Sequence, residues 1–109
     1  RAFPLRSLLD AGASVLLGSD APVEPAEPLR WIHAASERRR PNGEPAGGWW
    51  PAERIGREEA LARTVAGPLL PGAPADLVAY GEDLLACPAE RLLDLRPTAV
   101  FVGGARWEG

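Results

Sequence analysis

The chain has 109 residues, which is enough for one ordinary small domain and too few for a complete large α/β barrel of about 250 residues. Its hydrophobic fraction of 46% and charged fraction of 25% are typical of a folded protein. The net charge of -3 provides no attraction to nucleic acid or to an anionic membrane surface, and no apolar run reaches the roughly 18 residues of a membrane span. We therefore expect neither a nucleic-acid partner nor a membrane partner.

A short helix followed by a buried strand is predicted at the start of the chain. Residues 4–11 begin with a proline and carry leucines at helical spacing, and Gly12 follows at the position typical of a helix end. The apolar run at residues 14–17 comes after a tight connection. A helix joined closely to an apolar strand is typical of an α/β unit, in which such strands are usually parallel and buried.

Asp20 follows this apolar run, after the small residues Gly18 and Ser19. A carboxylate at the end of a buried strand is in a position to enter a site at the edge of a sheet. The alternative is a turn in which Asp20 accepts backbone hydrogen bonds, and the residues taken alone favour this turn.

The next helix is predicted to start at Pro28, after a stiff segment that contains three prolines over residues 21–28. Its inward stripe contains Leu29, Ile32, His33 and Ser36. His33 is the only histidine, so we interpret it as a packed side chain in preference to a metal ligand. The arginines at 38–40 suit a solvated helix end better than an anion site.

Residues 41–52 form a loop rich in glycine and proline, with Trp49 and Trp50 near its end. The two tryptophans suit either the cover of a substrate pocket or an anchor that holds the loop to the body, and the sequence leaves both readings open. A further helix is predicted over residues 57–65, where it is ended by Gly67 and Pro68.

The last third of the chain has the pattern of a small β unit. Strands are predicted over residues 76–80 and 98–102, with a helical turn over residues 88–95 between them. Gly103 and Gly104 supply the positive φ angles of a two-residue hairpin turn. Because so few strands are marginal in water, this unit is expected to pair with other strands.

Cys87 is the single cysteine, so no disulfide can form within the chain. It lacks charged neighbours in sequence and is interpreted as a small, partly buried apolar residue and not as a nucleophile. The chain starts at Arg1 without a signal region, and this start resembles a cut edge. A reducing, cytoplasmic localisation is the expectation.

Several motifs, in order and spacing, resemble the metal-dependent amidohydrolases of the amidohydrolase-3 type. Residues 5–12 and 16–23 resemble the last barrel strand of that family and its surroundings. Residues 48–61 resemble the segment after the barrel. Residues 71–78 resemble its "PGxxADLV" strand, and residues 102–106 its closing hairpin. The resemblance covers nearly the whole chain.

The resemblance implies an α/β fold: residues 1–70 as the C-terminal portion of a TIM-like (β/α)8 barrel, and residues 71–109 as a segment of a small composite β-sandwich. The portion of the barrel that this chain would supply does not form a complete barrel on its own. The resemblance also implies hydrolysis of carbon–nitrogen bonds other than peptide bonds, on a small amide-type substrate. Asp20 inherits the role of metal ligand or general base at a divalent metal, with zinc expected in the complete enzyme.

Two departures from the family pattern matter. The family's first-strand His-x-His pair, its later histidines and its bridging lysine have no counterpart, because this chain has one histidine and no lysine. The metal site is therefore expected to be incomplete in this chain, and the chain alone inactive. The connection over residues 65–71 is also abrupt, which indicates either a deletion or a missing loop.

The alternative function is a noncatalytic interaction or assembly module that requires partner strands. In either case the exposed barrel-facing surface predicts association with the remainder of the barrel, or self-association through residues 15–17 or the hairpin.

Overall fold

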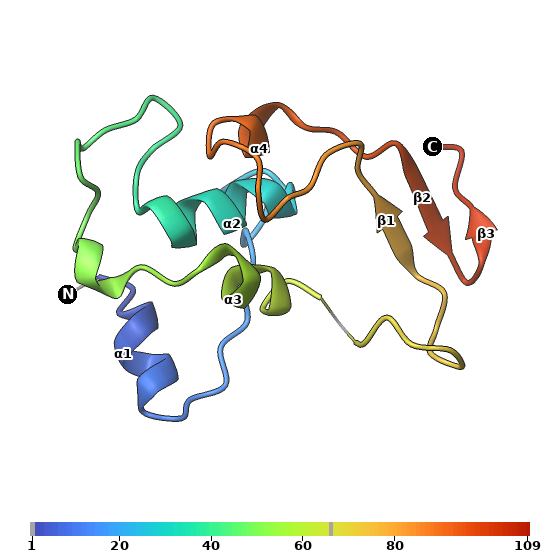
Figure 1. Ribbon diagram of the computed structural model, residues 1–109, viewed down its shortest axis with the longest axis horizontal. Coiled ribbons are helices and arrows are strands. Elements are labelled where there is room, and N and C mark those ends of the chain that lie inside the picture. The colour runs from blue at the N-terminus through green and yellow to red at the C-terminus, as the bar shows by residue number, and fades with distance from the viewer. Residues whose placement is uncertain (1, 66) are drawn as a thin grey trace.

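The computed structural model describes residues 2–65 and 67–109. The unusual start at Arg1, and Ala66 within the abrupt connection, lie outside these residues. The described elements, in chain order, are α1 (Leu5–Asp10), α2 (Pro28–Glu37), the 3-10 turn η1 (Pro51–Glu53), α3 (Arg57–Ala62), β1 (Leu77–Ala79), α4 (Arg91–Asp94), β2 (Ala99–Val102) and β3 (Ala105–Arg106). The helices of the first two thirds form one side of the molecule and the sheet forms the other (Figure 1).

The core lies where α2 packs against α3 and α4. The buried residues of α2 are Leu29, Ile32, His33 and Ala35. The predicted inward stripe is confirmed at Leu29, Ile32 and His33, whereas Ser36 is only partly buried. The other buried apolar side chains, from the segments around α3 and α4, are Ile55, Ala60, Cys87 and Leu92. Because α4 belongs to the last third of the chain, the helical core joins residues from both predicted domains. The boundary at residue 70 stays a prediction.

Local signals explain where the helices begin and end. Pro28 occupies the first turn of α2, and the helix ends at Arg38, whose backbone is left-handed with φ 57°. At the start of α3, Glu59 accepts a hydrogen bond from the backbone N–H of Gly56 at 3.1 Å. The same carboxylate accepts from Arg6 of α1 at 2.9 Å, and this bond, as the main cause, lowers the pKa of Glu59.

The sheet has three antiparallel strands in the order β1-β2-β3. Val78 of β1 lies opposite Val100, and Val102 of β2 lies opposite Ala105. Gly103 and Gly104 have φ angles of 58° and 82°, so the predicted two-residue turn between β2 and β3 is confirmed. The described residues form a small α/β fold with this sheet, and no barrel is present among them.

The strand predicted over residues 14–17 is wrong for the described chain. This segment has no regular secondary structure and no strand partner, and Leu16 is 80% exposed. It is attached to the helical part by the backbone N–H of Leu17, which donates to the carbonyl of Arg63 at 2.9 Å. Apolar composition favours a strand, but a strand needs a neighbour that supplies hydrogen bonds. The sheet contains none close to this segment.

Candidate functional site

Asp20 lies at the first position of a tight turn. Its carbonyl accepts a hydrogen bond from the N–H of Val23 at 2.9 Å, and its own backbone is left-handed with φ 51°. The Oγ of Ser19 accepts from the N–H of Ala21 at 3.1 Å and tightens the same turn. Asp and Asn tolerate the left-handed conformation better than most side chains. The turn that the residues favoured is therefore present, and it leaves the Asp20 side chain exposed.

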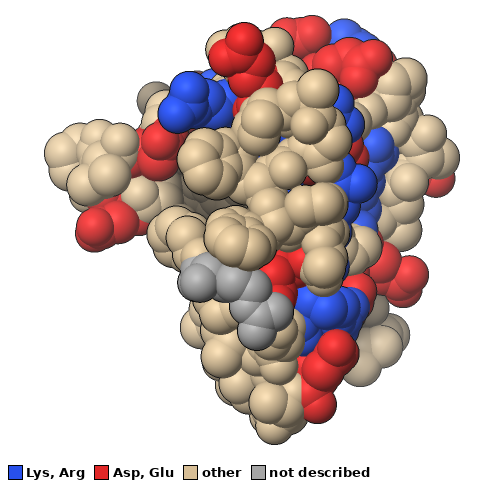
Figure 2. Space-filling model, turned by 90° about the vertical axis from the view of Figure 1, so that its left-hand side faces the viewer, with Lys and Arg blue, Asp and Glu red and all other residues tan. Residues whose placement is uncertain are grey.

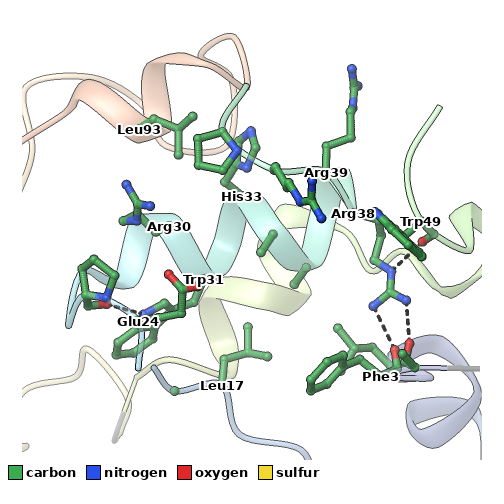
Figure 3. A pocket seen from close by; sticks show the side chains of 18 of the residues that line it. Phe3, Leu17, Glu24, Arg30, Trp31, His33, Arg38, Arg39, Trp49 and Leu93 are labelled. Carbon is green, nitrogen blue, oxygen red and sulfur yellow. Dashed lines mark hydrogen bonds between the residues drawn. The ribbon is translucent and has the colours of Figure 1, made fainter. Parts of the chain in front are cut away.

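A groove of about 560 Å³ runs along α2 (Figure 3). Gly18 and Glu24, which flank Asp20 in the sequence, line this groove, whereas Asp20 itself does not. Apolar walls come from segments far apart in the chain, such as Leu17 and Leu93. The predicted candidates that the groove brings together are His33, Arg38, Arg39, Arg40, Trp49 and Trp50. Cys87 and Asp20 are outside its lining.

Arg38 is buried, which corrects the expectation of a solvated helix end at this residue. Its Nε donates to the carbonyl of Trp49 at 3.0 Å, and its two terminal nitrogens donate to the carbonyls of Phe3 and Ala2 at 2.9 and 2.8 Å. Figure 3 shows the guanidinium directed from the end of α2 toward Phe3. The planar guanidinium has five N–H donors, so one side chain can join three segments in this way.

Arg39 and Arg40, which follow Arg38, are closer to the solvated helix end that the sequence predicts. Arg39 is partly buried and donates to the carboxylate of Glu37 at 3.0 Å, while Arg40 is exposed. Together with Arg30 they add positive charge to the lining of a mainly apolar groove. Such a groove can hold an apolar or aromatic body that carries an anionic group.

The interpretation of His33 as a packed side chain is confirmed. It is 7% exposed, within the buried stripe of α2. Burial lowers its pKa, and the positive charge of Arg39 and Arg57 acts in the same direction, whereas Glu37 opposes it. A neutral imidazole is therefore favoured near neutral pH.

Of the two readings that the sequence left open for Trp49 and Trp50, the structure supports the anchor, and the cover of a substrate pocket stays a prediction. The backbone N–H of Trp49 donates to the carbonyl of Arg38 at 2.6 Å, which anchors the loop to the end of α2. Both tryptophan residues stay about half exposed, at 54% and 50%, and line the groove. Figure 2, viewed from this side, shows a face formed mostly by uncharged residues with groups of charged side chains among and around them.

Cys87 is buried and carries no disulfide, as expected of a small apolar residue. Arg57 donates to its carbonyl oxygen and contacts its Sγ at 3.8 Å. The same guanidinium donates to the carbonyl of Leu84 at 3.2 Å. Through these hydrogen bonds Arg57 links α3 to the segment that precedes α4.

One buried carboxylate was not found from the sequence. Glu53 is 2% exposed and accepts hydrogen bonds from the N–H of Ser7 at 2.9 Å and from its Oγ at 2.6 Å. It therefore satisfies a backbone donor in the first turn of α1. The two residues are 46 positions apart, so no local pattern indicates the pair.

A divalent metal does not fit the described residues taken by themselves. No group of three or more His, Cys, Asp or Glu side chains in residues 2–65 and 67–109 is placed to hold an ion. Structural and catalytic zinc sites need at least three protein ligands. His33 is packed in the helical core, and Asp20 contributes a single exposed carboxylate.

Comparisons with known proteins add one finding. The sequence model of the amidohydrolase family matches residues 1–106. Comparison with curated protein sequences and with solved structures gave no significant match. Within the described part of the chain, no helix has the length and apolar character that crossing a membrane requires.

Proposed function

Since the chain belongs to the amidohydrolase family, we propose that it acts in the hydrolysis of carbon–nitrogen bonds other than peptide bonds. The proposed fold context is a TIM-like barrel to which residues 1–70 contribute the last portion, with residues 71–109 in a composite β-sandwich. Length supports this context, because 109 residues fall well short of the roughly 250 of a complete barrel. The substrate class is a small amide.

The observation that carries the proposal is the position of Asp20. Its turn follows the segment 13–19, which has no regular secondary structure, and residues on both sides of the turn line the groove along α2. An exposed carboxylate beside a mainly apolar groove can reach a substrate whose body occupies that groove. The tryptophans and arginines that line the groove suit a substrate whose acyl or aromatic part carries a negatively charged group.

In the proposed reaction Asp20 is the general base. A water oxygen attacks the amide carbonyl carbon while the Asp20 carboxylate accepts a proton from that water. The carbon–nitrogen bond then breaks, and the protonated carboxyl returns the proton to the leaving nitrogen. One carboxylate therefore serves both proton transfers. A divalent metal belongs to the proposal only for the complete enzyme, where further ligands would have to come from residues outside this chain.

The test is a comparison of Asp20→Asn with Glu27→Gln in the complete polypeptide that carries these residues. Glu27 is a carboxylate in the same loop that forms no side-chain hydrogen bond at the start of α2. With a panel of non-peptide amides, Asp20→Asn should lower kcat by about 100-fold or more, the usual contribution of a general base. Glu27→Gln should retain turnover. Unchanged turnover in Asp20→Asn would exclude the proposed role.

A second candidate function is that of a noncatalytic assembly module, and the exposed apolar residues of the sheet favour it. Large apolar side chains of the sheet are exposed, including Val78 at 53% and Val102 at 58%. A three-stranded sheet with an uncovered apolar face is a binding surface for another layer of structure. Mixing the chain with the remaining barrel segment and measuring association by size exclusion separates this candidate: no association with any partner would count against it.

A further inference from the structure

The groove along α2 contains an arginine whose charge the rest of the described chain leaves unpaired. Arg30 lines the groove and is partly buried, and within residues 2–65 and 67–109 its guanidinium has neither a hydrogen-bond nor an ion-pair partner. By contrast, Arg38 donates to three carbonyls, and Arg39 is paired with Glu37. A partly buried cation in a mainly apolar groove gains most from an anionic partner. A bound anion can fill this role.

The stability of α2 does not account for this arginine. The helix begins at Pro28, so Arg30 lies in its first turn, where the helix dipole disfavours a cation. The first turn contains no acidic residue, and Figure 3 shows Glu24 on the opposite side of α2 from Arg30. Within the described part of the chain, the lining of the groove has four arginines and one glutamate. The charge of the groove is therefore complementary to an anionic ligand.

Arg30 lies at the end of the groove that is next to the Asp20 turn. The Nε1 of Trp31 donates to the carbonyl of Pro25 at 3.2 Å, which holds the loop after Asp20 against the first turn of α2. Pro25 lines the groove together with Arg30. Arg38 follows α2 at its other end, and at a rise of about 1.5 Å per residue it is about 12 Å further along the helix axis. An anion bound by Arg30 is therefore held at the Asp20 end of the groove.

We propose that Arg30 binds a carboxylate that the substrate carries close to its amide, and thereby determines which amides the groove accepts. The planar guanidinium matches the two carboxylate oxygens, and two parallel hydrogen bonds fix the orientation of the ligand as well as its charge. The apolar or aromatic body of the ligand then extends along α2 toward Trp49 and Trp50. This inference rests on the proposed function for the nature of the ligand, whereas binding is measured without turnover.

Binding of two matched probes to the 109-residue chain tests the role of Arg30. N-Benzoylglycine has an aromatic ring, an amide and a carboxylate, and N-benzoylglycinamide has a neutral amide in place of that carboxylate. His33 is the only histidine and lines the groove, so the NMR signals of its ring report occupancy of the groove. The wild type should bind the carboxylate probe about tenfold or more tightly than the neutral probe, as one hydrogen-bonded ion pair provides.

Arg30→Gln should abolish this preference, because it removes the charge and keeps a polar side chain. Arg40→Gln is the matched control: Arg40 also lines the groove but is exposed beyond the other end of α2, so the preference should remain. If Arg30→Gln fails to fold by circular dichroism, Arg30→Met, which keeps an apolar stem, takes its place. The proposal is overturned if the wild type shows no preference, or if Arg40→Gln reduces the preference as much as the Arg30 variant does.

The complete polypeptide separates this inference from the proposed hydrolysis. In its Asp20→Asn form, which should not turn the probes over, the preference for N-benzoylglycine should persist. Its absence there would show that other residues occupy the groove, and the carboxylate site at Arg30 would be excluded. Turnover of amides without a preference for the carboxylate would also overturn the site and leave the hydrolysis standing. Binding with the preference, but without turnover in the unmodified polypeptide, would support the site and overturn the hydrolysis alone.

Discussion

The buried guanidinium of Arg38 offers the sharpest test of how the groove is held together. Its three hydrogen bonds join the end of α2 to the chain start at Ala2 and Phe3 and to the loop at Trp49. We expect Arg38→Ala to destabilise the chain and to release both segments from the end of α2.

The magnitude follows from the three bonds. A hydrogen bond from a charged donor contributes about 1.5–3 kcal/mol, but the contributions are not additive, and exposed carbonyls regain water when the donor is removed. Since Ala2, Phe3 and Trp49 are exposed residues, we expect a net loss of about 2–4 kcal/mol. The left-handed backbone at position 38 adds no difference, because arginine and alanine are both L residues with a Cβ.

Urea unfolding monitored by tryptophan fluorescence measures this loss. With a slope of about 2 kcal/mol per molar urea, the middle of the usual range for small proteins, the midpoint should fall by about 1–2 M. Arg40→Ala is the matched control, because Arg40 is exposed and should change stability by less than about 0.5 kcal/mol. Arg38→Lys should give an intermediate loss, since an ammonium cannot reproduce the planar donor set. An Arg38→Ala variant as stable as Arg40→Ala would refute the reasoning.

Three further predictions concern residues around the groove and the core. Ser7→Ala removes the 2.6 Å bond from Oγ to buried Glu53 and should cost about 1.5–3 kcal/mol in chemical unfolding; a loss below about 0.5 kcal/mol would contradict this role. Because burial lowers the pKa of His33, the unfolded chain binds the proton more readily, so stability should fall as pH decreases through about 6.5. His33→Gln should flatten this dependence in unfolding curves recorded from pH 8 to 5, and an unchanged profile would show that other groups cause it. A Cβ added at Gly48 would meet the carbonyl oxygen of Glu37 at 2.7 Å, whereas Gly47 has a similar φ angle and open space. Gly48→Ala should therefore lower thermal stability by about 1–3 kcal/mol more than Gly47→Ala, and equal losses would exclude the steric explanation.

The sequence by itself determined the local elements. Neighbours within a few residues are enough to predict the start of α2 at Pro28 and the buried positions of Ile32 and His33. They are also enough to predict the hairpin turn at Gly103 and Gly104. The turn at Asp20 is local in the same sense. The family resemblance was also readable from the sequence, and the amidohydrolase family model matches residues 1–106.

Only the tertiary structure decided which distant groups meet. The apolar run at residues 14–17 lacks a strand partner, which composition cannot reveal. Arg38 becomes buried because carbonyls from two other segments reach the end of α2. Glu53 becomes buried where it accepts hydrogen bonds from Ser7, a residue 46 positions earlier in the chain. Hydrogen bonds and burial depend on groups brought together by folding, whereas helix ends and turns depend on backbone preferences of adjacent residues. That difference is why the elements were predictable and their partners were not.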